Sequence, residues 1–239
     1  MFTLQPAEMS LRIIASEVAS CRACDRLVEW RERVGVEKRR AFMDWDYWAR
    51  GVPGFGDERA RLLVLGLAPA AHGANRTGRV FTGDRSGDWL FAALHRAGFA
   101  NQPTSTSASD GLVLTDAYVT AAVKCAPPEN KPTIGERDNC QGFLLREIEA
   151  LPNLRAILCL GKFGWDQGLR VLRATGRSIP TPIPKFGHNV AALVDDFVLI
   201  GCYHPSQQNT FTGRLTEAML DDALDGARRA VEGEAGGGG

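Results

Sequence analysis

Short apolar runs along the chain alternate with longer segments in which apolar residues recur at helical spacing. The apolar runs predict four strands, at residues 61–67, 113–123, 156–160 and 197–203. The periodic segments predict helices at residues 10–19, 88–97, 133–151, 163–175 and 216–231. Strands that alternate with helices favour a parallel sheet with helices on both faces. The predicted fold class is therefore α/β.

Two of these helices carry additional signals. Leu11, Ile14 and Val18 are spaced so that they share one face of the first helix. Thr133 is followed three residues later by Glu136, which is typical of a capping box and predicts the start of a helix. Residues 179–189 are rich in proline, and we expect them to leave the regular alternation of strands and helices.

Polar, proline-marked segments follow the first, second and fourth predicted strands. They comprise residues 66–84, 124–133 and 204–216. In an open parallel sheet, ligands bind just outside the carboxyl ends of the strands. Because all three segments should emerge at that edge, we expect them to form one site. The first segment combines small residues, which let the backbone approach a ligand closely, with Phe81 and Asp84.

The chain has 239 residues, of which 44% are hydrophobic, and this suits one domain with a sizeable core. We expect residues 1–232 to form that domain and the glycine-rich residues 233–239 to be a disordered tail. No apolar run is long enough to cross a bilayer, and the N-terminus does not resemble a signal peptide, so a cytoplasmic protein is expected. The formal net charge of zero argues against a histone-like electrostatic binder, but it permits a local basic groove.

The six cysteines divide into two groups by their surroundings. Two of them, Cys159 and Cys202, lie inside apolar runs, where free cysteine packs as a small hydrophobic residue. The other four form a C-x2-C pair and a C-x14-C pair in loops or near helix starts: Cys21, Cys24, Cys125 and Cys140. Four thiolates suit either zinc or an iron–sulfur cluster, and the spacing does not choose between them. All four ligand positions would be filled, so the site is expected to be structural.

Three motifs carry a resemblance to a known family. The first segment begins GLAPA at residue 66 and ends FTGD at residue 84, residues 124–133 read KCAPPENKPT, and residues 204–216 read HPSQQNTFTGRLT. Together with the four cysteines, they resemble the uracil-DNA glycosylase superfamily, and specifically its family-5, or type-b, branch. The resemblance covers about residues 21–231. It implies a three-layer α/β/α sandwich with a central four-stranded parallel sheet, a [4Fe-4S] cluster rather than zinc, and hydrolysis of the bond between a damaged base and deoxyribose.

The resemblance also assigns roles to particular side chains. An enzyme of this kind takes the base out of the DNA stack into a pocket, where Phe81 would stack on it. Asp84 would stabilise the cation-like sugar and position water, and His204 would hydrogen-bond the departing base and offset its negative charge. Asn130 is a further catalytic candidate, and His72 a candidate for binding the base. The simpler alternatives are that Phe81 is a core aromatic and that Asp84 caps the following helix.

Two positions depart from the pattern of related branches. In those branches an acidic or amide residue lies two positions after Gly66, whereas here that position is Ala68. The role in catalysis therefore shifts to Asp84. Uracil-restricted relatives also carry an asparagine near the end of the second strand to read the base edge, and Ala121 occupies the corresponding position here. Without that amide the pocket should discriminate less, so we expect uracil first, with hypoxanthine, xanthine or modified uracils as further substrates.

The expected partner of a monomeric enzyme of this kind is DNA, most simply double-stranded DNA. The segment after the fourth strand is the natural wedge into the duplex, and its candidates are Gln207, Gln208, Phe211 and Arg214. Phosphate contacts are expected from basic residues near the motifs, each of which has a solvated surface role as its alternative: Arg76, Arg79, Arg85 and Lys131.

No lysine is placed as an obvious Schiff-base nucleophile, so the enzyme should remove the base without cleaving the strand.

Two other functions compete with this interpretation. The main alternative is an iron–sulfur module that recognises DNA damage with little catalysis. Ala68 favours this alternative, because the acidic or amide residue of related branches is missing at that position. An ordinary nucleotide-binding hydrolase is disfavoured, because neither G-x-G-x-x-G nor G-x-x-x-x-G-K-[ST] follows a strand.

Overall fold

The structure, a computed structural model, describes residues 10–233 of the chain. The first nine residues, and residues 234–239 of the expected tail, lie outside the described residues.

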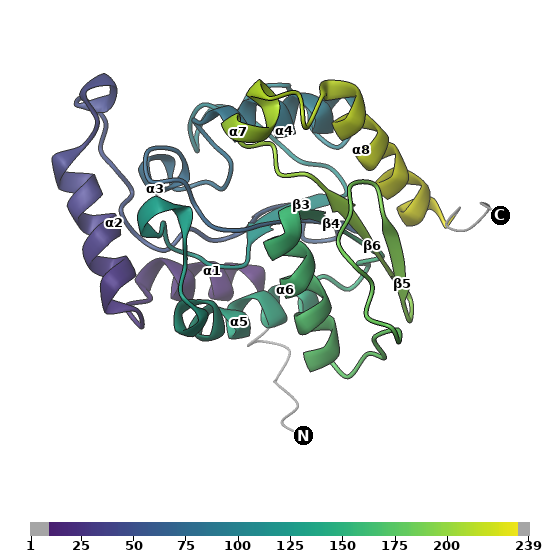
Figure 1. The fold of residues 1–239 in the computed structure, drawn as a ribbon. Coiled ribbons are helices and arrows are strands. Elements are labelled where there is room, and N and C mark those ends of the chain that lie inside the picture. The colour runs from purple at the N-terminus through teal and green to yellow at the C-terminus, as the bar shows by residue number, and fades with distance from the viewer. Residues whose placement is uncertain (1–9, 234–239) are drawn as a thin grey trace.

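A six-stranded sheet lies at the centre of the structure, in the order β1-β3-β2-β4-β6-β5 (Figure 1). Its strands are β1 (Phe55–Gly56), β2 (Leu62–Gly66), β3 (Ala117–Ala121), β4 (Ala156–Leu160), β5 (Ala191–Val194) and β6 (Phe197–Cys202). The four central strands are parallel, which confirms the expected core of the sheet. The short strands β1 and β5 add antiparallel edges. The sheet is therefore mixed, rather than made of four parallel strands alone.

Helices cover both faces of the sheet, which confirms the three-layer α/β/α arrangement (Figure 1). Side chains alternate along a strand, so Val64 of β2 packs beneath α4 and α8, while Leu63 and Leu65 pack against α1, α5 and α6. The helices are α1 (Leu11–Ser20), α2 (Asp25–Glu37), α3 (Ala74–Thr77), α4 (Arg85–Arg96), α5 (Ile134–Glu149), α6 (Gly161–Ala174), α7 (Gln207–Phe211) and α8 (Glu217–Glu232), with 3-10 turns η2 (Arg40–Phe42) and η3 (Pro128–Asn130). Within residues 10–233, none of these helices is long and apolar enough to span a bilayer.

The local sequence signals are visible in the structure. Leu11, Ile14 and Val18 are the buried residues of α1, as their spacing predicts. The capping box at the start of α5 is also confirmed: the Thr133 side chain accepts from the Glu136 backbone amide, and the Glu136 carboxylate accepts from the Thr133 amide at 2.7 Å. These interactions fix where the helix begins and so place Cys140 two turns further along.

The second strand is shorter than predicted, because a tight turn precedes it. Asp116 has a positive φ of 59°, and its carboxylate accepts hydrogen bonds from the backbone and side chain of Arg61. Regular pairing starts only at Ala117, and Val113 is exposed. The sequence analysis did not predict α2, α3, α7 or the edge strands.

Candidate active site

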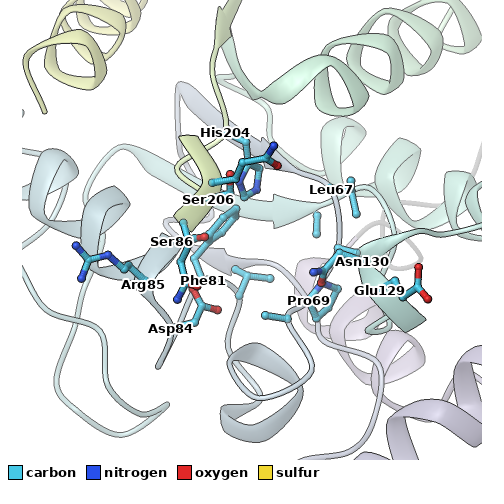
Figure 2. Close-up of a pocket in the computed structure, with 16 residues that line it drawn as sticks. Leu67, Pro69, Phe81, Asp84, Arg85, Ser86, Glu129, Asn130, His204 and Ser206 are labelled. Atoms are coloured by element: carbon cyan, nitrogen blue, oxygen red, sulfur yellow. The ribbon is translucent and has the colours of Figure 1, made fainter. Parts of the chain in front are cut away.

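The carboxyl ends of β2, β3 and β6 open onto a cavity of about 610 Å³ (Figure 2). Three segments line it, and they are the three that the sequence predicted to meet at this edge of the sheet. The loop after β2 contributes residues 67–70, 80, 81 and 84–86; the end of β3 and η3 contribute residues 121, 129 and 130; and the segment after β6 contributes residues 204 and 206–208. The cavity is thus built from segments far apart in the sequence.

Phe81 enters the cavity from a strained backbone position. Its φ is 51°, in the left-handed region that residues other than glycine rarely adopt. Two glycines make room for it: a Cβ on Gly66 would lie 2.6 Å from Phe81 Cζ, and a Cβ on Gly87 would collide with the Phe81 carbonyl oxygen. Figure 2 shows the ring beside His204, and the two ring centroids are 5.9 Å apart at an angle of 35°. Backbone strain of this kind persists where surrounding contacts over-determine it, often at functional sites.

Asp84 both lines the cavity and caps α4. Its Oδ1 accepts a hydrogen bond from the Gly87 amide at 3.0 Å, so the simpler role predicted for this residue is real. Its Oδ2 lies so close to Gly73 that a Cβ on that glycine would collide with it. Burial raises the pKa of the Asp84 carboxyl above its ordinary value, although hydrogen bonds from the start of α4 act in the opposite direction. A desolvated carboxylate held by a helix cap is thus fixed at the edge of the cavity.

His204 follows β6 almost directly and faces the same cavity. The Asn209 side chain donates to the His204 carbonyl oxygen at 2.8 Å, which fixes the backbone before α7. Burial lowers the pKa of His204 to about 4, because the surroundings disfavour the charged imidazolium. The ring is therefore neutral at pH 7 and can donate one N–H or accept one hydrogen bond.

Of the remaining predicted pocket residues, Gly66 and His72 do not line the cavity, although Gly66 packs directly against the Phe81 ring. Ala68 and Ala121 line it and present only methyl groups. Asn130 lines it from η3, where its φ of 56° turns the chain, and its side chain has no hydrogen-bond partner among residues 10–233. His72 is not among the lining residues: its Nδ1 lies 3.1 Å from the Tyr47 hydroxyl, and the two rings meet edge to face. The structure thus gives His72 a partner in the segment after α2.

The basic residues of the first segment do not share one environment. Arg76 is only 3% exposed, and its guanidinium donates to the carbonyl oxygens of His72 and Gly83 at 2.8 and 2.9 Å. Arg79 is also buried and forms an ion pair with Asp110 at 2.7 Å. Both side chains are committed to the interior, because they hold the loop together. Neither is exposed for the phosphate contact that the sequence analysis expected of it.

On the opposite side of the cavity, the candidates for DNA contact are exposed. Gln207 and Gln208 of α7 line the cavity, and Phe211 is 67% exposed at the end of that helix. The Arg85 guanidinium lies 4.9 Å from the centroid of the Phe211 ring, which links the start of α4 to α7. Arg214 is exposed and lies over the Tyr203 ring.

The four candidate metal ligands come together at the N-terminal end of α2. Cys21, Cys24, Cys125 and Cys140 line one small recess, and three of their sulfurs have N–H donors nearby. These donors are Arg31 Nη1 at 2.9 Å from Cys125 Sγ, Asn139 Nδ2 at 3.3 Å from Cys24 Sγ, and the Lys124 amide at 3.5 Å from Cys140 Sγ. Within residues 10–233, no three or more His, Cys, Asp or Glu side chains have the geometry of a metal-ion site. Cys159 and Cys202 are buried in β4 and β6, as predicted.

Sequence reasoning missed Arg31, which is 1% exposed and also donates to the Cys21 carbonyl oxygen at 2.9 Å. A signal for it exists. Leu27, Arg31 and Val34 recur at helical spacing, so a cation falls on the apolar face of α2. A charged residue in that position is rarely buried unless it has a partner, and the sulfur site supplies one.

Comparisons of the sequence with known proteins identify the family to which the chain belongs. The profile of the uracil DNA glycosylase superfamily matches residues 53–228. A protein of Mycobacterium tuberculosis named type-5 uracil-DNA glycosylase is 57% identical over 214 residues, which are 89% of this chain and 78% of that protein. Proteins with the same name from Mycobacterium leprae and Thermus thermophilus are 54% and 44% identical, cover 92% of this chain, and are themselves covered to 95% and 98%. The chain belongs to the uracil DNA glycosylase superfamily, in the branch of the type-5 uracil-DNA glycosylases.

Proposed function

We propose that this protein is a monofunctional DNA glycosylase that hydrolyses the N-glycosidic bond of uracil in DNA. The observation that carries the proposal is the meeting of Phe81, Asp84 and His204 around one cavity (Figure 2). These three side chains could hold a base, assist the sugar and assist the leaving group. In a cell, this reaction would be the first step of base excision repair.

The base would reach the cavity only after leaving the DNA stack. Phe81 supports this step because its ring is exposed to the cavity and held by Gly66 and Gly87, so it is preorganised for stacking. Stacking of a base on an aromatic ring contributes about 1–3 kcal/mol. Phe211, with Arg85 against its ring, is an exposed aromatic side chain at the end of α7 and the best candidate to fill the gap left in the duplex.

Cleavage of the glycosidic bond leaves positive charge on the sugar, so the carboxylate of Asp84 would act there. In the ionised form it would stabilise the cation-like sugar and orient the attacking water. Its fixed position, with one oxygen bound to the Gly87 amide, means that little reorganisation is needed during the reaction. Ala68 has no polar group to share this task. Glu129 also lines the cavity, but its carboxylate is exposed and pairs with Lys131 at 3.2 Å, which leaves Asp84 as the buried carboxylate of the lining.

The departing base carries negative charge, and His204 would offset it. Because burial lowers the pKa of His204 to about 4, the ring would act at pH 7 as a neutral hydrogen-bond donor, not as a general acid. Asn130, whose side-chain amide is unpartnered among the described residues, is the further candidate for contact with the base edge or the water.

The residues around the cavity support hydrolysis without strand cleavage. Among the described residues, those that line it include no lysine, so no amine is placed to form a Schiff base with the sugar. The methyl groups of Ala68 and Ala121 leave that side of the pocket without a specific reader of the base edge. We therefore propose that hypoxanthine or xanthine is also removed, with less discrimination than an asparagine at residue 121 would impose.

We also propose that the four cysteines hold a [4Fe-4S] cluster. The donor set suits this group, because four thiols from two distant segments converge and three have N–H donors at hydrogen-bond distance, a feature that tunes iron–sulfur sites. With all four ligands supplied by the protein, the cluster would tie α1 and α2 to the segment after β3. It would serve as a structural group, and no chemical step requires it.

The test is a glycosylase assay on duplex oligonucleotides that contain uracil or hypoxanthine, with the products resolved before and after alkali. Strand breaks that appear only after alkali would establish base removal without strand cleavage. A gel-shift assay of Asp84→Ala then separates the two functions: loss of excision with retained DNA binding supports the enzyme. Binding of damaged duplex without excision by the wild-type protein would instead favour the damage-recognition module. Sedimentation of the free protein and of its complex would test the expected monomer.

A further inference from the structure

A short basic segment between α2 and β1 is not part of the site described above. We call residues 38–46 the basic arm. Arg39 and Arg40 are exposed, and neither has an ion-pair partner among the described residues. Lys38, by contrast, donates to the Met43 carbonyl oxygen at 3.1 Å and so closes the turn of the arm. The exposed side chains also include Met43 and Trp45, at 54% and 36% exposure.

The arm rests directly on the loop that carries Asp84. The Arg76 guanidinium lies 3.9 Å from the ring centroid of Phe42 and 4.1 Å from that of Trp45. The same guanidinium donates to the carbonyl oxygen of Gly83, the residue before Asp84. One buried cation therefore connects the arm to the catalytic loop, which explains why Arg76 is not free to contact phosphate.

Further contacts attach the residues that follow the arm to the same loop. The Trp48 amide donates to the Arg76 carbonyl oxygen at 3.0 Å, and the Tyr47 hydroxyl lies 3.1 Å from His72 Nδ1. The charge of Arg39 reaches this loop as well: burial lowers the pKa of His72, and the charges of Arg39 and Arg76 lower it further. The arm is thus a preorganised surface beside the cavity.

DNA whose base enters the cavity must pass its backbone across the cavity mouth. Arg85 lies on one side of that mouth, and Pro69 and Glu129 lie on the other (Figure 2). Within the first loop, Arg76 and Arg79 are buried, so besides Arg85 at its end the loop offers exposed cations only through the arm that packs on it. Two carboxylates of the arm, Asp44 and Asp46, are also exposed, which restricts the phosphate contact to the end of the arm at Arg39 and Arg40.

We propose that Arg39 and Arg40 of the basic arm bind backbone phosphates of duplex DNA beside the damaged nucleotide. The proposal rests on the proposed function in naming DNA as the ligand, and it concerns binding rather than bond cleavage. Contacts to phosphate carry no sequence information, so the arm would add the same affinity to damaged and undamaged duplex. They would also release counterions, which makes their contribution dependent on salt.

The experiment compares the wild-type protein with an Arg39→Ala/Arg40→Ala variant. The Kd for a duplex with a non-hydrolysable uracil nucleotide, and for the undamaged duplex, is measured over a range of salt concentrations. Losing two phosphate contacts should reduce the slope of log Kd against log salt concentration by about 2. It should also weaken binding to the two duplexes by the same factor. The single-turnover rate of uracil excision at saturating DNA should stay within about twofold of the wild-type rate.

A matched control removes the same charge elsewhere. Arg173 of α6 and Arg229 of α8 are exposed, have no ion-pair partner among the described residues, and lie near the helix ends away from the cavity edge of the sheet. Arg173→Ala/Arg229→Ala should leave the salt slope unchanged. If the arm variant keeps the wild-type slope while the wild-type protein excises uracil, the arm proposal is overturned and the proposed function stands. If the slope falls but the wild-type protein excises nothing, the arm proposal stands and the proposed function fails.

Discussion

Gly66 and Phe81 touch at the end of β2, where a Cβ on the glycine would lie 2.6 Å from Phe81 Cζ. A real Cβ essentially never approaches this closely, so the ring would have to move. We expect Gly66→Ala to reduce uracil excision by about 100-fold, because a shift of about 1 Å at a reacting centre can cost that much. Single-turnover kinetics on a uracil duplex would measure the loss.

The control for this substitution is Gly135→Ala in the first turn of α5. A Cβ there meets nothing within 4 Å, and alanine is the better helix former. Excision by that variant should equal that of the wild-type protein. Full activity of Gly66→Ala would show that the packing of the Phe81 ring against β2 is not needed.

Asp84→Asn should abolish most excision and yet stabilise the fold. Asparagine caps a helix as well as aspartate does, so the bond from the Gly87 amide is kept while the buried charge is removed. The pKa of Asp84 is raised in the folded state, so ionisation of Asp84 costs stability as the pH rises through that value. The variant should therefore have a higher Tm at pH 7, by about 2–4 °C for each kcal/mol relieved. The gain should shrink towards zero in acid, where both side chains are neutral.

Asp110→Asn provides a control of the opposite sign. Burial alone would raise the pKa of Asp110, but hydrogen bonds from Arg79 and backbone amides outweigh it and lower the pKa to about 2. This carboxylate therefore stabilises the fold at neutral pH, and the stabilisation is lost progressively as the pH falls from the ordinary pKa of about 3.9 to the folded value of about 2. Its replacement should lower the Tm at pH 7. If Asp84→Asn lowers the Tm at pH 7 as Asp110→Asn does, the account of Asp84 as a destabilising, desolvated charge is wrong.

His204 should act without titrating in the physiological range. An ordinary histidine has a pKa near 6.5, whereas burial lowers that of His204 to about 4. Replacement by asparagine, which retains an N–H donor, should preserve more activity than replacement by alanine. Any acid limb of the wild-type rate should persist in His204→Asn, because it belongs to Asp84. Disappearance of the limb in that variant would instead assign it to the histidine.

Ala121→Asn should narrow the range of bases. The alanine is the last residue of β3 and lines the cavity, so an amide there could pair with one base edge and leave an unmade hydrogen bond with others. The ratio of uracil to hypoxanthine excision should rise by about tenfold or more. The measurement is kcat/KM for both substrates in parallel, and an unchanged ratio would place the base edge elsewhere in the cavity.

Cys125→Ser should remove bound iron and labile sulfide, while Cys159→Ser should not. Cys125 lies in the recess shared with the three other cysteines, whereas Cys159 is buried in the middle of the sheet. Iron, zinc and sulfide analysis of the purified proteins provides the comparison. Zinc without sulfide in the wild-type protein would contradict the proposed cluster.

The sequence predicted the parallel core of the sheet because buried parallel strands are continuous apolar runs. All five residues of β2 and of β4 are buried, so their runs are not interrupted by exposed positions. The edge strand β5 has the opposite character. Only alternate residues are buried, and Leu193 is exposed, so four residues of modest hydrophobicity gave no comparable signal.

The candidate site was predictable only where its residues follow the strands directly. The convergence of Phe81, Asp84 and His204 was expected because the alternation of elements implies parallel strands, whose carboxyl ends lie at one edge of the sheet. The burial of Arg76 could not be read in the same way, because its partners Phe42 and Trp45 come from a segment outside the strand–helix pattern. The contact between His72 and Tyr47 could not be predicted either, because Tyr47 also lies outside the strand–helix pattern. Contacts from such irregular segments have no periodicity that marks them.

The cavity has a consequence for the synthesis of the protein. Its walls come from segments after β2, β3 and β6, and β6 pairs with β4 on one side and β5 on the other. A chain still growing on the ribosome can form the first of these walls early, but it lacks His204 until most of its 239 residues have been made. Pairing between strands so distant in sequence is slow compared with local folding. We therefore expect the nascent protein to acquire its base pocket as one of its last steps, after translation is nearly complete.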